Sequence, residues 1–181
     1  MFDDLKRDYA RAYAQCGYQG VWRKRLHTWT NPGFQAVAVY RLTRWLMHHH
    51  IPFVGAVLQR LIEVWSGVSI PPEAKIGPGI LILHSGGIVV NGAAVIGEDL
   101  TLHHEVTIGN RVSGGGSPVI GHRAMLGVGA KVLGDIQLGD DVDIGANAVV
   151  LSSIPDRAVA VGIPARVIRF KSEGKETPSG K

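Results

Sequence analysis

Three histidines in the part of the chain after residue 68 stand at equivalent places in a repeating pattern, and histidine is the side chain best suited to moving protons near neutral pH. His84, His104 and His122 each come two residues after an aliphatic residue. An imidazole beside a hydroxyl can act as a general base and activate that oxygen for attack on a carbonyl carbon. The single cysteine, Cys16, lies outside this part of the chain. The pattern therefore favours acid–base chemistry over a covalent thiol intermediate.

The histidines belong to a six-residue repeat that begins near residue 68. Glycine usually follows the aliphatic position, and another small or aliphatic residue comes four positions after it. With one two-residue slip, the aliphatic positions are Ile70, Ile76, Ile82, Val90, Ile96, Leu102, Ile108, Ile120, Leu126, Val132, Leu138, Ile144 and Val150. A period of six is typical of a hexapeptide β-helix, in which three hexapeptides close one triangular coil around inward aliphatic side chains.

Stacking of such coils predicts which histidines meet. Neighbouring coils lie about 4.8 Å apart, and His84 and His104 are one coil apart in the same phase, so we expect their side chains to lie close together. His104 could orient a substrate, bind a carboxylate or sugar hydroxyl, or simply be exposed. Glu105 could polarise a histidine or be a solvated charge. We expect His122 to lie outside the site.

Two other parts of the chain depart from the repeat. The segment 110–119 (NRVSGGGSPV) lacks the inward aliphatic residue and predicts an extruded loop, which on a rigid scaffold often carries function. Before residue 68 the apolar spacing is helical: we expect helices over 3–15, after Asn31-Pro32, and from Pro52 to a stop at Gly67. The predicted organisation is a helical region (1–68), a β-helix (69–168) and a flexible tail (169–181).

Composition limits the possible partners and location. The 181 residues suffice for one domain with a helical appendage, and the formal charge of +4 is too small and scattered to indicate nucleic acid. The first eleven residues are charged, and no run of about 18 apolar residues exists. We therefore expect a cytoplasmic protein without a membrane span.

Three segments carry a resemblance to a known family: GILILHSGGIVVNGAAVIGEDLTLHHEVTIGN (79–110), VGIPARVI (161–168) and PGFQAVAVYRLTRWL (32–46). They resemble the serine O-acetyltransferases among the hexapeptide acyltransferases. The run HHEVTIGNR (103–111) is also similar to the serine-acetyltransferase-like enzymes of exopolysaccharide synthesis. The resemblance implies a left-handed β-helix, acetyl-CoA as co-substrate without a metal, and a homotrimer with active sites between adjacent subunits. Whether trimers pair through the helices stays open.

The resemblance also implies roles for individual residues. His84 matches the catalytic histidine, and Ser117, with His104 and Glu105, is expected at the acceptor. The residues expected to bind CoA are Gly127, Gly129, Ala130, Lys131, Gly145, Ala146 and Arg166. Small residues would let the pantetheine arm lie against the backbone, and the two cations could pair with phosphates. The alternative for the glycines is that each is an ordinary turn residue.

Departures from the family pattern bear on the acceptor. Ser69 and Leu83 stand where the family has aspartates, and Gly116-Ser117-Pro118 stands where it has Arg-His-Pro. The isoleucine tail that docks onto cysteine synthase is not evident. The predicted function is transfer of acetyl from CoA to a hydroxyl, that of L-serine in cysteine biosynthesis. A sugar hydroxyl in polysaccharide biosynthesis is the alternative. The remote alternatives are a zinc enzyme like the gamma-carbonic anhydrases and an inactive scaffold.

Overall fold

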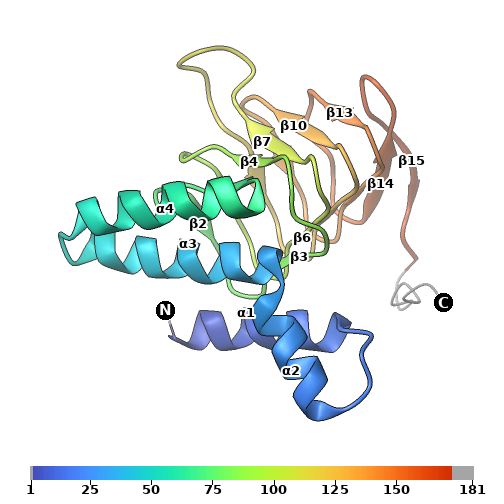
Figure 1. Cartoon of the computed structure of the whole chain (residues 1–181). Helices are drawn as coiled ribbons and strands as arrows, with labels where there is room; N and C mark the ends of the chain where they lie inside the picture. Colours follow the sequence, from blue (N-terminus) through green and yellow to red (C-terminus); the bar gives the residue numbers. More distant parts are fainter. Residues whose placement is uncertain (1, 173–181) are drawn as a thin grey trace.

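The computed structural model describes residues 2–172, which form a helical region followed by a parallel β-helix (Figure 1). The helices are α1 (Phe2–Gln15), α2 (Val21–Thr30), α3 (Pro32–His48) and α4 (Pro52–Ser66). Helices α3 and α4 lie side by side and project from the first coils of the β-helix. None of the described helices is long and apolar enough to cross a membrane.

The helix ends follow the signals in the sequence. The side chain of Asn31 accepts a hydrogen bond from the Phe34 amide at 3.1 Å and so caps α3. Helix α4 ends at Gly67, whose φ of 65° lies in the left-handed region that glycine adopts without strain. Helix α2 was not predicted, because it begins after Gly20 without a side-chain cap, although Trp22, Leu26 and Trp29 have helical spacing.

The β-helix consists of short strands arranged in three sheets. The first sheet has the order β1-β4-β7-β10-β13, the second β11-β8-β5-β2, and the third β15-β14-β12-β9-β6-β3. The strands are β1 (Val68–Ser69), β2 (Lys75–Ile76), β3 (Leu81–Ile82), β4 (Ile88–Val90), β5 (Val95–Ile96), β6 (Thr101–Leu102), β7 (Thr107–Gly109), β8 (Val119–Ile120), β9 (Met125–Leu126), β10 (Lys131–Leu133), β11 (Gln137–Leu138), β12 (Asp143–Ile144), β13 (Val149–Val150), β14 (Ala158–Val161) and β15 (Arg166–Phe170).

The six-residue repeat determines the core. Ile82 pairs with Leu102, Leu102 with Leu126, and Leu126 with Ile144, so equivalent repeats stack in register. Every aliphatic position of the repeat is buried, which confirms the predicted β-helix. A single coil could not bury these side chains, so the coils stabilise one another by stacking.

The predicted domain limits need small corrections. Strand β1 begins at Val68, one residue before the expected boundary, because Gly67 already ends α4. At the other end, residues 169 and 170 belong to β15, which pairs antiparallel with β14, and not to a tail. The remainder of the expected tail from residue 173 onward, with the terminus at which a docking tail was sought, lies outside the described residues.

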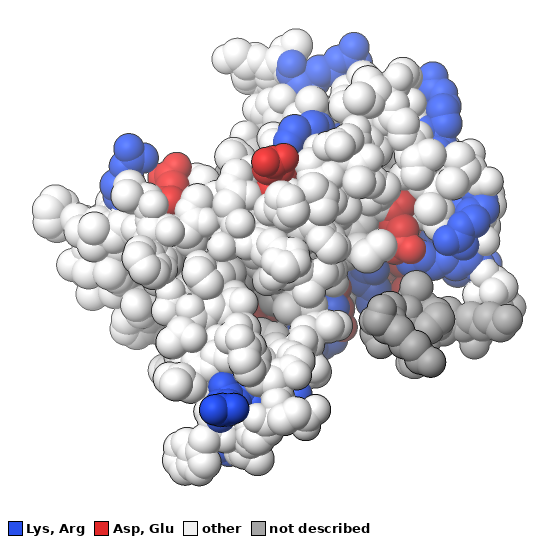
Figure 2. All heavy atoms as spheres, turned by 45° about the vertical axis from the view of Figure 1, so that its right-hand side comes forward, with Lys and Arg blue, Asp and Glu red and all other residues white. Residues whose placement is uncertain are grey.

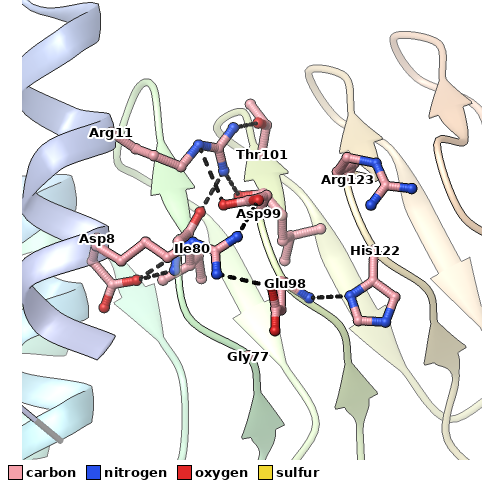
Figure 3. A network of polar contacts seen from close by, with 12 residues as sticks. Asp8, Arg11, Gly77, Ile80, Glu98, Asp99, Thr101, His122 and Arg123 are labelled. Atoms are coloured by element: carbon pink, nitrogen blue, oxygen red, sulfur yellow. Dashed lines mark hydrogen bonds and ion pairs between the residues drawn. The ribbon is translucent and has the colours of Figure 1, made fainter. Parts of the chain in front are cut away.

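A buried ion pair joins the helices to the first coil. Asp8 is fully buried in α1, and its carboxylate accepts hydrogen bonds from the amides of Gly79 (2.7 Å) and Ile80 (2.9 Å), as Figure 3 shows. Arg41 of α3, also buried, donates its Nε to Asp8 at 2.8 Å and its terminal nitrogens to two carbonyls of the same coil. Both charges are therefore hydrogen-bonded, as buried charges must be.

Helix α1 also reaches the second coil through two arginines (Figure 3). Arg7 forms ion pairs with Glu98 at 2.8 Å and Asp99 at 2.6 Å. Arg11 donates to the Thr101 hydroxyl at 3.0 Å and to the Gly79 carbonyl. These contacts fix α1 against the two coils that carry His84 and His104.

We predict that Asp8→Ala lowers the free energy of unfolding by about 3–5 kcal/mol, because Arg41 would remain buried without its partner. Urea denaturation measures the change. Asp3→Ala, which removes an exposed ion pair with Lys6, serves as the control and should leave the midpoint unchanged. Equal midpoints for both variants would contradict the structural role of Asp8.

Candidate active site

The corners that follow β3, β6, β9 and β12 stack into one edge of the prism, here called the histidine edge (residues 83–87, 103–106, 127–130 and 145–148). Backbone hydrogen bonds fix the stacking: the Leu83 amide donates to the Leu102 carbonyl at 3.0 Å, and the Gly127 amide donates to the Ile144 carbonyl at 2.8 Å. Two columns of residues result. One contains Leu83, His103, Gly127 and Gly145, and the next contains His84, His104, Val128 and Ala146.

His84 and His104 lie together on this edge. Their ring centroids are 6.0 Å apart and the rings meet at 75°, which confirms the stacking expected from the repeat. His84 is exposed, whereas the Nδ1 atom of His104 is buried and has no hydrogen-bond partner among the described residues. A buried ring nitrogen without a partner is costly unless something binds it. The pair can therefore accept a proton at one imidazole and hold a polar group at the other.

A third imidazole, His103, belongs to the same cluster. Partial burial lowers the pKa of His103 below its usual range, and the neighbouring His84 and His104 lower this pKa further. His103 therefore stays neutral at physiological pH. His103 has no role among the site residues predicted from the sequence. The available signal was that His103 occupies the position where most repeats have glycine.

Of the two alternatives for Glu105, its surroundings favour the solvated charge. Its carboxylate is exposed and, within residues 2–172, makes no hydrogen bond or ion pair to a histidine. The backbone of Glu105 forms the corner, with a φ of 61°. Its amide donates to the Gly86 carbonyl at 2.8 Å, and its carbonyl accepts a hydrogen bond from the ammonium of Lys131. Lys131 therefore already has a partner on the histidine edge.

The structure places His122 on a different edge, formed by the corners after β2, β5, β8 and β11. There its Nδ1 accepts a hydrogen bond from the amide of Glu98 at 3.1 Å (Figure 3). The amide of His122 donates to Asp140 at 2.7 Å. His122 is thus occupied in holding a turn and is not part of the histidine cluster.

The structure does not bring Ser117 to the histidines within one chain. The extruded segment 110–118 connects β7 to β8 on the remaining edge, called the loop edge, and projects from the prism in Figure 1. Gly116 packs there against Asp135, which lies in the corner after β10. A Cβ atom added to Gly116 would lie 2.5 Å from the Cβ atom of Asp135. The hydroxyl of Ser117 is buried without a hydrogen-bond partner in the described part of the chain.

The residues expected to bind CoA lie on or beside the histidine edge, with corrections for Ala130 and Gly129. The side chain of Ala130 is fully buried in the core; its amide donates to Gly127 at 3.1 Å and its carbonyl accepts from Thr107 at 2.9 Å. Ala130 therefore offers no free group to a ligand. Gly127 is required by packing, because a Cβ there would lie 2.8 Å from the Ile144 carbonyl.

The far end of the edge is more open. Gly145 stacks on Gly127, and Ala146 is exposed. Gly129, in contrast, is buried: its amide donates to the His104 carbonyl at 3.0 Å, and its φ of 71° serves the turn. Exposed Arg166 begins β15, where it pairs with Val161 beside the last corner. Four strand spacings of about 4.8 Å place that corner roughly 19 Å from His84. The edge is thus a strip with imidazoles at one end and a cation at the other.

The zinc alternative lacks a ligand set in one chain: within residues 2–172 no group of three His, Cys, Asp or Glu side chains could hold a metal ion.

Comparison with known proteins identifies the class. Residues 117–152 match the model of the bacterial transferase hexapeptide family (six repeats). A serine acetyltransferase of Helicobacter pylori (strain ATCC 700392 / 26695) is 44% identical over 139 residues, 76% of this chain and 81% of the relative. The serine acetyltransferase of Escherichia coli (strain K12) is 41% identical, and the match covers 75% of this chain but 50% of the longer relative.

Solved structures agree over nearly the whole chain. The serine acetyltransferase of Vibrio cholerae O1 biovar El Tor N16961 superposes with a TM-score of 0.86 at 29% identity, covering 95% of this chain and 67% of that one. A serine acetyltransferase in complex with CoA gives a TM-score of 0.81 at 35% identity, covering 92% and 68%. The chain adopts the left-handed β-helix of these enzymes. It belongs to the serine acetyltransferase family.

The lowered pKa of His103 predicts how stability depends on pH. The folded state resists protonation of His103, so the unfolded state binds more protons as the pH falls through the unfolded pKa of about 6.5. Wild type should therefore lose more free energy of unfolding than His103→Gln between about pH 7.5 and 5, measured by urea denaturation. Parallel losses for the two proteins would contradict this assignment.

Proposed function

We propose that this chain is an acetyl-CoA-dependent serine O-acetyltransferase with His84 as its general base, forming O-acetylserine for cysteine biosynthesis. The observation that carries the proposal is the exposed His84 imidazole stacked 6.0 Å from His104 at one end of the histidine edge. Membership of the family, whose solved members include complexes with serine, with cysteine and with CoA, supports both substrates.

The chemistry follows from the imidazole. His84 takes the proton of the acceptor hydroxyl while that oxygen attacks the thioester carbon, and the carbonyl electrons move onto oxygen. When the tetrahedral intermediate collapses, the carbon–sulfur bond breaks and the thiolate of CoA takes the proton from His84. Acetyl passes directly from sulfur to oxygen, so no protein nucleophile is needed.

CoA is proposed to lie along the histidine edge with its thiol at His84. The side-chain-free backbone at Gly127 and Gly145 gives the pantetheine arm a flat path, and Arg166 at the far corner suits a phosphate. Lys131 is a weaker candidate for a phosphate, because its ammonium already bonds to the Glu105 carbonyl.

The acceptor site is proposed to form between subunits of a homotrimer. Ser117 stands on the loop edge, whereas His84 stands on the histidine edge of the same prism. A neighbouring copy that sets its loop edge against this histidine edge would bring the two together and give the buried Ser117 hydroxyl and the His104 nitrogen a shared ligand. Three identical contacts of this kind close a ring. We infer a cytoplasmic enzyme, in agreement with the absence of a disulfide framework.

A sugar hydroxyl is the second candidate acceptor. The observation in its favour is that Gly116-Ser117-Pro118 offers a hydroxyl and no cation for a carboxylate. Turnover of a nucleotide sugar but not of L-serine by the purified protein would establish this acceptor in place of serine.

We predict that His84→Ala lowers kcat for L-serine by about 10²- to 10⁴-fold, because the hydroxyl loses its base. Release of the CoA thiol measures the rate. His122→Ala is the matched control: it also removes an imidazole from a corner of the prism, but on another edge, and should keep kcat within about twofold. Comparable losses for both variants would remove His84 from the mechanism.

We also predict that two inactive variants restore activity when mixed. One variant carries His84→Ala, and the other lacks residues 112–116 and so shortens the loop. Co-refolded subunits would form some interfaces with an intact histidine edge and an intact loop edge. A mixture no more active than its components, although native mass spectrometry shows mixed trimers, would contradict a site shared between copies.

A further inference from the structure

Helix α2 presents an apolar stripe to solvent. Trp22, Leu26 and Trp29 stand at i, i+4 and i+7, and so share one helix face. Their exposed fractions are 82%, 66% and 55%. The opposite face, with buried Thr28, rests on the protein. The ring of Trp29 packs on one side against Tyr9 (5.6 Å between ring centroids) and Phe34 (5.3 Å), which holds α2 in place. Trp22 and Leu26 remain largely exposed, and such exposed apolar patches mark interaction sites.

Cations flank this stripe. At 100° per residue, Arg23 and Arg25 fall on either side of the line through Trp22 and Leu26. Both arginines are exposed, and in the described part of the chain neither forms an ion pair. The guanidinium of Arg25 lies 6.0 Å from the centre of the Trp22 ring. Helix α2 contains no acidic residue. An apolar face with tryptophan, bordered by cations, is the pattern of a helix that lies in a lipid–water interface.

The stripe continues onto α4 through Gln35. The side-chain amide of Gln35 donates to the Trp29 carbonyl at 3.0 Å, and its oxygen accepts from the Trp65 indole at 3.0 Å. Trp65, 70% exposed, joins further exposed apolar residues of α4: Phe53, Val57, Leu61 and Val64. Figure 2 shows one side of this region, where uncharged atoms predominate and cations gather at the lower end, the level of α2 in Figure 1.

We propose that the surface formed by Trp22, Leu26 and Trp29, with Arg23 and Arg25, docks the protein on an anionic lipid bilayer. The indoles and the leucine would enter the headgroup region, and the arginines would contact lipid phosphates. The charge pattern favours this occupant over a two-fold contact with a second copy of the chain, and the proposed three-fold contact uses the loop edge and the histidine edge. A two-fold contact sets a surface against itself and would bring the cations of α2 against those of its partner with no acid on either helix. An anionic surface attracts the same cations. This inference does not depend on the acceptor of the reaction.

The test is sedimentation of the full chain with vesicles of phosphatidylcholine containing about one third phosphatidylglycerol, compared with pure phosphatidylcholine. We expect binding to the anionic vesicles, a blue shift of tryptophan fluorescence, and release by salt. Each cation near such a surface contributes about fivefold to binding, so Arg23→Glu with Arg25→Glu should weaken binding at least about twentyfold. Trp22→Ser with Leu26→Ser should abolish the blue shift.

Controls separate this role from folding and from assembly. Arg169→Glu with Phe170→Ser changes one exposed cation and one exposed apolar residue on β15 and should leave vesicle binding unchanged. All variants should keep their transferase rate with soluble substrates and their mass by light scattering. Failure of the wild type to bind anionic vesicles at low salt, or equal binding by the α2 variants, would overturn the proposal. A change of oligomeric mass in the α2 variants would assign the surface to a second copy instead.

Discussion

The structure depends on the register in which successive coils hydrogen-bond to one another. Each coil donates its amides to the carbonyls of the next, as His103 does to Leu126 at 3.1 Å and Gly145 to Ala160 at 2.8 Å. Because the register is fixed, a residue's position within the hexapeptide decides whether it lies in the core, on a sheet face or along an edge. A slip of one residue would turn the aliphatic side chains outward and separate the histidines.

This register divides the prism into three edges with different uses. One edge is tied to the helices: Arg7 binds the corner at Glu98 and Asp99, and His122 supports the same corner. The histidine edge has large side chains on its first two coils and glycine on the next two, which leaves an uncovered backbone beside the imidazoles. The loop edge carries Ser117. The helical region contributes by holding the first coil through the buried pair of Asp8 and Arg41.

The sequence predicted those features of the fold and the site that depend on the six-residue repeat. The core positions, the stacking of His84 on His104 and the extruded loop all follow from a period of six that holds over many coils. The pair of Asp8 and Arg41 could not be predicted, since its members are 33 positions apart and follow no local pattern. Helix α2 was missed because no capping side chain marks its start at Gly20, although its apolar residues have helical spacing. The burial of Ala130 agrees with its place in the repeat, four residues after Leu126, where most repeats have a small or aliphatic residue.

The most direct measurement is a crystal structure of the protein with CoA. We predict that the thiol lies between the imidazoles of His84 and His104, that the pantetheine arm follows Gly127 and Gly145, and that the loop bearing Ser117 comes from a neighbouring subunit. CoA bound along either of the other edges, or a thiol remote from His84, would contradict the assignment of the histidine edge as the active site.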